Sequence, residues 1–153
     1  PPDTILEDGV QNTFGFGPVL VRDGAVAEEE CLRHRVRNKN PRAGIGMVEP
    51  GHYVAIVVDG RQAEYSVGVT LLEYAEMFVN EGCTVAYNMD GGVSSGMLFM
   101  GENLNQHKDS RSKKHSGQRS WADALLFGYS ELVPTEDDPI YNTGNLDEKK
   151  PRE

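Results

Sequence analysis

Short apolar runs separated by glycine-containing turns set the pattern of this chain. The run at 18–22 meets Asp23-Gly24 and returns through 25–27, which is typical of two strands joined by a two-residue hairpin turn. Residues 52–58 read HYVAIVV, a near-continuous apolar run that predicts a strand buried on both faces. Residues 28–40 are rich in charge, and we expect a solvated connector or a short edge strand there.

The clearest helical pattern lies over residues 70–81. Thr70 is a suitable N-cap, and Glu73 stands three residues later, as a capping box requires. Gly82 follows the last periodic position and can end the helix in a left-handed conformation. One apolar face at helical spacing is formed by Leu71, Leu72, Ala75, Phe78 and Val79.

A further apolar run at 83–89 predicts a strand, so that 52–58, the helix and 83–89 form a strand-helix-strand unit. If its two strands are parallel neighbours, their carboxyl ends meet at one end of the sheet. Asp59 and Asp90 follow these strands directly, and we expect both to face one crevice.

The fold class predicted from these elements is α+β, a mixed β-sheet with one main amphipathic helix. Two more strands are expected at 97–100 and 122–129. We place the domain at 14–133, with a polar segment at 1–13 before it. The tail at 134–153 has few apolar residues, and we expect it to be disordered or draped on the surface.

Charge and composition exclude several classes of protein. The 153 residues include 24 acidic and 15 basic side chains, and the net charge of −9 disfavours sequence-independent binding of nucleic acid. No apolar run approaches the roughly 18 to 20 residues of a membrane span. Cys31 and Cys83 are too few for a disulfide framework, and we expect two unbridged thiols.

Candidate chemistry gathers directly after the apolar strands, where side chains are held on rigid elements and remain open to a ligand. The constellation comprises Asp59-Gly60-Arg61, Ser66-x-Gly68 and the run from Asn88 to Gly96. Two ordinary Asp-Gly turns are the plainer interpretation. Six of the seven residues from Asp90 to Gly96 are Asp, Gly or Ser, however, which favours close backbone approach to an anion.

Metal and nucleotide sites have weaker support. The four histidines lack zinc-site spacing, and the glycine-rich run lacks the ending of a phosphate-binding loop. The oxygens of Asp59, Asp90 and Asn88 are of the kind that Ca²⁺ takes, but nothing in their spacing imposes a calcium site. We therefore predict no metal and no cofactor.

Five blocks in order carry a resemblance to a known family: FGPVLVRDG, NPRAGIG, VVDGRQAEYSVGVTLLEYAE, EGCTVAYNMDGGVSSGM and QRSWADALLF. Together they resemble the phosphodiester glycosidase domain family over Phe14 to Phe127. This sequence has Val93 where the family usually has a third glycine and Gly96 where it often has threonine. The family's upstream part is not matched, so we expect association with an upstream fragment that completes the fold.

The resemblance implies hydrolysis of a glycosyl-1-phosphodiester at the anomeric carbon, on a surface or secreted glycan. It implies a carbohydrate phosphodiester as partner and an extracellular or cell-envelope location, in a bacterium. Carried over by motif, the catalytic residues are Asp90, Asp59 and Arg61. The substrate-binding residues are Arg42, Arg119, Ser66, Thr70, Asn88, Gly91, Gly92, Ser94 and Ser95. The alternative function is a non-catalytic module that binds anionic glycans.

The implied reaction is chemically consistent with these residues. A phosphomonoester has a second pKa near 6 and leaves with little protonation, so two carboxylates are not obligatory. We expect Asp90 to act as nucleophile or base, and Arg42, Arg61 and Arg119 to hold the phosphate. Asp59 would orient an arginine or bind sugar hydroxyls.

Overall fold

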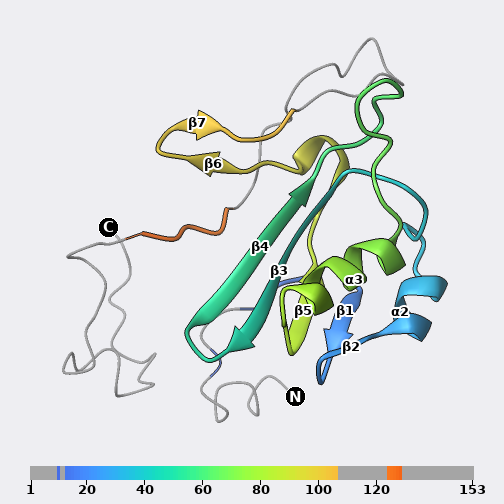
Figure 1. Cartoon of the computed structure of the whole chain (residues 1–153), viewed down its shortest axis with the longest axis vertical. Coiled ribbons are helices and arrows are strands. Elements are labelled where there is room, and N and C mark those ends of the chain that lie inside the picture. The colour runs from blue at the N-terminus through green and yellow to red at the C-terminus, as the bar shows by residue number, and fades with distance from the viewer. Residues whose placement is uncertain (1–9, 11–12, 107–123, 129–153) are drawn as a thin grey trace, which may run out of the picture. The chain divides into compact units, whose positions relative to one another are not determined.

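The computed structural model describes residue 10 and residues 13–106 and 124–128 (Figure 1). Contacts divide the chain into the unit Phe14–Ala122 and a second unit, Pro1–Thr13 with Asp123–Glu153. In the second unit, residues 124–128 are exposed and form no strand, so the strand predicted at 122–129 is wrong over these residues. The predicted tail at 134–153 and nearly all of the predicted polar segment at 1–13 lie outside the described residues.

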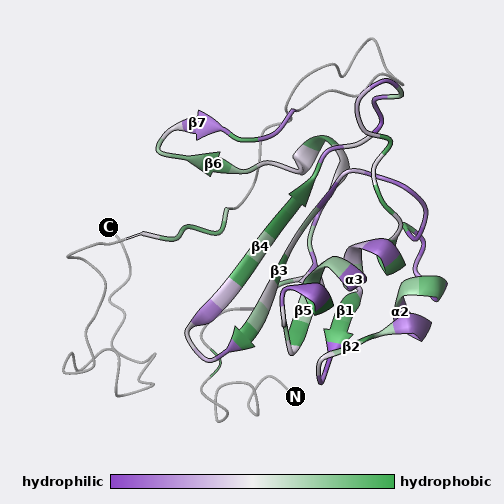
Figure 2. Ribbon diagram, viewed as in Figure 1, coloured by the Kyte–Doolittle hydropathy of each residue, from purple (hydrophilic) through white to green (hydrophobic). Residues whose placement is uncertain are grey.

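The first unit is built on a five-stranded antiparallel sheet with the order β2-β1-β5-β3-β4, so the predicted α+β class is confirmed. A separate two-stranded sheet pairs β6 with β7. The strands are β1 (Val19–Arg22), β2 (Ala25–Val26), β3 (Arg42–Glu49), β4 (His52–Val58), β5 (Val85–Asn88), β6 (Leu98–Phe99) and β7 (Glu102–Asn103). The helices are α2 (Glu28–Arg33), α3 (Leu71–Asn80) and the short 3-10 helix η1 (Gly92–Ser94). Figure 2 shows hydrophobic residues along much of β1, β3, β4 and β5.

The predicted strand-helix-strand unit differs from the structure in one respect. The strand β3 lies between β4 and β5 and runs antiparallel to both, so β4 and β5 are parallel to each other but are not neighbours. The strand β3 has no clear pattern in the sequence, because Gly44 and Gly46 interrupt its apolar positions. A Cβ at Gly44 would lie 2.8 Å from the Tyr74 hydroxyl, and one at Gly46 would lie 2.6 Å from the Cys83 sulfur. Close packing of α3 and Cys83 on the backbone of β3 therefore explains the glycines that hide the strand.

Two further expectations are corrected. The charged stretch 28–40 contains α2, whose first turn carries three glutamates and whose last turn carries Arg33, an arrangement that complements the helix dipole. Its one buried residue is Cys31, and a single buried apolar residue produces no helical period in the sequence.

The strand β4 is not buried on both faces, because it lies at the sheet edge, where Tyr53 is 52% exposed.

The main helix α3 begins and ends as predicted. Thr70 accepts a hydrogen bond from the Glu73 backbone N–H at 3.2 Å and completes a capping box, and Gly82 is left-handed with φ 78°. Tyr74 and Phe78 are fully buried and meet edge to face at 5.2 Å. The Tyr74 hydroxyl donates to the Ile56 carbonyl at 2.7 Å, which fastens α3 to β4.

Replacing Thr70 by alanine removes the N-cap, and we expect the free energy of unfolding to fall by about 1 kcal/mol. Hydrogen bonds from the Thr70 backbone N–H and hydroxyl hold the pKa of Glu73 below its ordinary 4.5. Alanine keeps the backbone N–H, so only the bond from the Thr70 hydroxyl to the Glu73 carboxylate makes the deficit depend on pH. That part of the deficit is present above pH 4.5 and is lost as the pH falls through the lowered pKa, whereas the N-cap part remains. Urea unfolding at neutral and at acidic pH checks the prediction. An equal deficit at both pH values would contradict it.

Both cysteines are buried free thiols, which confirms the prediction that they are not joined. Burial raises the pKa of Cys31 to about 11 and also raises the pKa of Cys83. Because the thiolate is the nucleophile, we expect both to react slowly with a thiol reagent in the native protein. Unfolding without a reductant should release two reactive thiols, and a titration that finds none would refute this.

Candidate active site

The candidate site lies at the end of the sheet where β4 and β5 finish and β3 begins. Residues Arg42 and Gly44 of β3 pair with Val58 at the end of β4 and with Asn88 at the end of β5, respectively. Asp59 and Asp90 directly follow these strand ends. The prediction that the two aspartates share one end of the sheet is therefore confirmed, although β3 separates their strands.

Backbone hydrogen bonds interlock the three segments at this end, namely 38–42, 59–70 and 88–95. Asn40 and Val69 exchange two bonds of 3.1 and 3.2 Å, which join the first segment to the second. The Gly92 N–H donates to the Pro41 carbonyl at 3.1 Å, which joins the first segment to the third. Residues that are distant in sequence thus form one backbone frame.

Arg61 lies against the loop that carries Asp90. Its Nε and Nη2 donate to Asn40 Oδ1 at 3.3 and 3.1 Å. A Cβ at Gly92 would lie 3.0 Å from Arg61 Nη1, so the guanidinium rests on the glycine backbone two residues after Asp90. Arg61 is half-buried, whereas Asp90 is exposed. This end of the sheet therefore presents a fixed guanidinium beside the loop of an accessible carboxylate.

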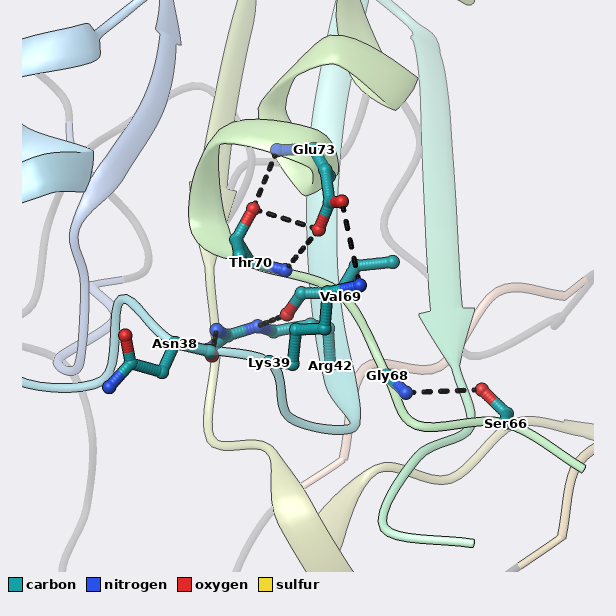
Figure 3. A network of polar contacts seen from close by, with 8 residues as sticks. All are labelled: Asn38, Lys39, Arg42, Ser66, Gly68, Val69, Thr70 and Glu73. Atoms are coloured by element: carbon teal, nitrogen blue, oxygen red, sulfur yellow. Dashed lines mark hydrogen bonds and ion pairs between the residues drawn. The ribbon is translucent and has the colours of Figure 1, made fainter. Parts of the chain in front are cut away.

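Arg42 is placed differently from Arg61. It is 2% exposed, and its guanidinium donates to the Val69, Val36 and Asn38 carbonyls at 3.2, 2.7 and 2.5 Å. Figure 3 shows Arg42 between Val69 and Asn38. Burial lowers the pKa of Arg42, and the nearby Arg61 charge acts in the same direction. These contacts give Arg42 a structural role, and its predicted role as a phosphate contact stays a prediction.

Both carboxylate oxygens of Asp59 accept hydrogen bonds from residues that sequence analysis did not single out. Oδ2 accepts from the Tyr65 hydroxyl at 3.2 Å, Oδ1 accepts from Asn105 Nδ2 at 3.0 Å, and the Gln106 N–H reaches both oxygens. The Asp59 charge and hydrogen bond raise the pKa of Tyr65. Tyr65 could be suspected from its place in the same loop as Asp59, but Asn105 and Gln106 carry no local signal.

The remaining predicted site residues mainly hold the frame. Ser66 donates through Oγ to the Asp59 carbonyl at 2.5 Å, and Thr70 is engaged in the helix cap. Asn88 is 1% exposed and donates to the Gly17 carbonyl at 2.8 Å. Asn88 Oδ1 and the hydroxyl of the buried Ser95 have no hydrogen-bond partner among the described residues. Gly91 packs on Pro41, Ser94 lies in η1, and Arg119 lies outside the described residues.

The described part of the chain contains neither a metal-binding cluster nor a membrane-spanning helix. Among those residues, no group of three or more His, Cys, Asp or Glu side chains could hold a metal ion. Within the same part of the chain, no helix has the length and apolar character needed to cross a membrane.

Comparison with solved structures places this fold among known ones. The zebrafish N-acetylglucosamine-1-phosphodiester alpha-N-acetylglucosaminidase catalytic domain, auto-inhibited by its pro-peptide, is 20% identical, with a TM-score of 0.53. That match covers 67% of this chain and 37% of the zebrafish chain. A Burkholderia pseudomallei K96243 protein described as exported is 33% identical over 52% of this chain and 15% of its own, with a TM-score of 0.45.

Sequence comparison supplies the family. The SPbeta prophage-derived uncharacterized protein YomE of Bacillus subtilis (strain 168) is 32% identical over 130 residues, or 84% of this chain. The matched part is 19% of YomE, so this chain spans about a fifth of that relative's length. The family model for phosphodiester glycosidases matches residues 2–128, which include the three segments that meet at the candidate site. On this evidence the chain belongs to the phosphodiester glycosidase family.

Proposed function

We propose that this chain carries a hydrolytic site that cleaves a glycosyl-1-phosphodiester between the anomeric carbon and the phosphate oxygen. The observation that supports this most directly is the Arg61 guanidinium resting on Gly92, beside the loop of the exposed Asp90. Membership in the phosphodiester glycosidase family supports the same reaction type.

In the proposed reaction, water adds to the anomeric carbon and the bond from that carbon to the phosphate oxygen breaks. The products are a free sugar and a phosphomonoester, whose second pKa near 6 makes it a competent leaving group without a strong general acid. A single carboxylate acting as base toward water, or as nucleophile, is then sufficient. Asp90 suits this role because it is exposed at the end of the sheet.

Arg61 is the proposed phosphate contact. An arginine is permanently charged and offers a planar fork that matches two phosphate oxygens. The contacts with Asn40 fix the side chain before substrate binds, so little conformational freedom is lost on binding. Negative charge that builds on the leaving phosphate would meet a positioned cation.

Hydrolysis of a synthetic sugar-1-phosphodiester in water labelled with ¹⁸O tests the proposal. Cleavage at the anomeric carbon puts the label into the released sugar, whereas attack at phosphorus puts it into the phosphomonoester. Label in the phosphate would refute the proposed bond cleavage. Glycan binding with no hydrolysis of any such diester would instead favour the alternative, a non-catalytic module for anionic glycans.

Replacing Arg61 by lysine should weaken phosphate binding while keeping the positive charge. Loss of the two-pronged contact is expected to raise KM by about tenfold, with a smaller change in kcat. Steady-state kinetics on the same diester check this. An unchanged KM would remove Arg61 from the phosphate site.

The substrate context extends the proposal beyond the site. The sugar, the extracellular or cell-envelope location, the bacterial origin and an upstream fragment that completes the fold all stay predictions. A panel of sugar-1-phosphodiesters that vary in sugar and in the second alcohol would define the substrate class.

A further inference from the structure

The carboxylate of Asp59 accepts hydrogen bonds on both of its oxygens. Three donors make four short contacts: the Tyr65 hydroxyl at 3.2 Å, Asn105 Nδ2 at 3.0 Å, and the Gln106 N–H at 3.0 and 2.9 Å. An ionised carboxylate has about four lone-pair positions. These contacts occupy most of the lone pairs of Asp59. A carboxylate that acts as base or nucleophile needs a lone pair that points at the substrate.

Asn105 extends these contacts to two other segments. Its Nδ2 also donates to the Ser95 carbonyl at 3.0 Å, and its Oδ1 accepts from the Met97 N–H at 2.9 Å. The Leu104 N–H donates to the Met97 carbonyl at 2.9 Å. One amide side chain thus links the end of β4 with the loop after β5 and with both ends of the β6–β7 hairpin.

The β6–β7 hairpin depends on this attachment for its position. It pairs only Leu98 with Asn103 and Phe99 with Glu102, and two-stranded ribbons of this length are marginal on their own. Figure 2 shows β6 as hydrophobic and β7 as hydrophilic, yet all four strand residues are exposed. Burial within the described chain therefore does little to hold the hairpin. The hydrogen bonds of Met97 with Asn105 and Leu104, at the base of the hairpin, hold it in position.

We propose that Asp59 is a positioning residue that, with Asn105, fixes the β6–β7 hairpin and the Ser95 loop beside the site. This inference rests on the proposed function and refines it, because it leaves Asp90 as the only reacting carboxylate of the pair. Asp59 acts through Asn105 and Gln106, and the segment from Asp90 to Ser95 keeps its shape because its far end is tied to Asn105.

The first test is independent of catalysis. Asp59→Asn replaces one acceptor oxygen by a donor group, so the contacts with Tyr65, Asn105 and Gln106 cannot all persist. We expect amide hydrogen exchange at Gln106 and Met97 to accelerate by about tenfold or more, with exchange in α3 unchanged. The matched control is Asp23→Asn in the hairpin turn, which should leave both amides as in the parent. Unchanged exchange at Gln106 would overturn the proposal whether or not the protein hydrolyses anything.

The second test separates positioning from direct chemistry. Asn105→Ala keeps the Asp59 carboxylate but removes the amide that ties it to the Ser95 carbonyl, and we expect turnover to fall about as far as in Asp59→Asn, with little further loss in the double variant. The acid limb of the kcat/KM profile should keep its position in Asp59→Asn. If Asn105→Ala loses protection at Met97 but keeps the parent's turnover, while Asp59→Asn does not, Asp59 is a reacting group and the proposal is wrong. If the parent protein hydrolyses no glycosyl-1-phosphodiester, the proposed function is refuted. The exchange experiment then still tests whether Asp59 holds Asn105 and Gln106 in place.

Discussion

Replacing Asp90 by asparagine should lower turnover of a sugar-1-phosphodiester by about 10²- to 10⁴-fold, the range typical of acid-base groups. The amide keeps the size of the side chain and much of its hydrogen bonding but removes its charge and basicity. Binding of the intact diester should survive or tighten, because a negative charge near an anionic substrate is removed. Single-turnover kinetics and a binding isotherm for the same diester measure the two effects separately.

The sequence offers a matched control for Asp90→Asn. Asp23 is also an exposed aspartate that precedes a glycine, but it lies in the β1–β2 turn with φ 51°, a conformation that asparagine tolerates. Asp23→Asn should leave turnover within about twofold of the parent, since surface changes of this kind are nearly neutral. If Asp90→Asn behaved like this control, with turnover within about threefold of the parent, Asp90 would not be the reacting group.

Replacing Arg42 by alanine should lower the free energy of unfolding by about 3 kcal/mol or more. The buried guanidinium supplies donors to the Val36, Asn38 and Val69 carbonyls, and alanine would leave them without these donors. These carbonyls belong to the segments before β3 and before α3, so the loss would loosen the frame of the site as well. Urea unfolding followed by circular dichroism measures the change.

Arg35→Ala is the control for Arg42→Ala, because Arg35 is exposed and lies between α2 and β3, next to Val36, whose carbonyl Arg42 contacts. It should change the free energy of unfolding by less than about 0.5 kcal/mol. A stability of Arg42→Ala equal to that of the control, together with a loss of phosphate binding, would show that Arg42 contacts the ligand. The expected outcome is the reverse, with the main deficit in stability.

The parts of the fold that follow from local rules were predictable from the sequence. The Asp23-Gly24 turn, the α3 cap at Thr70 and the strands at 52–58 and 83–89 each depend on residues within a few positions of one another. The strand β3 and the helix α2 did not follow from such rules. Gly44 and Gly46 are required by side chains that pack on them from α3 and from Cys83, and α2 is held by the single buried Cys31.

The candidate site divides in the same way. Sequence alone determined that Asp59, Arg61 and Asp90 follow strand ends, because an apolar run that stops at Asp-Gly is a local pattern. Only the tertiary structure decided that β3 separates the two strands, that Arg42 is buried against carbonyls, and that Asp59 is bonded to Asn105. The physical reason is that these contacts join residues as far as 46 positions apart in the chain. Such contacts produce no periodic pattern in the sequence.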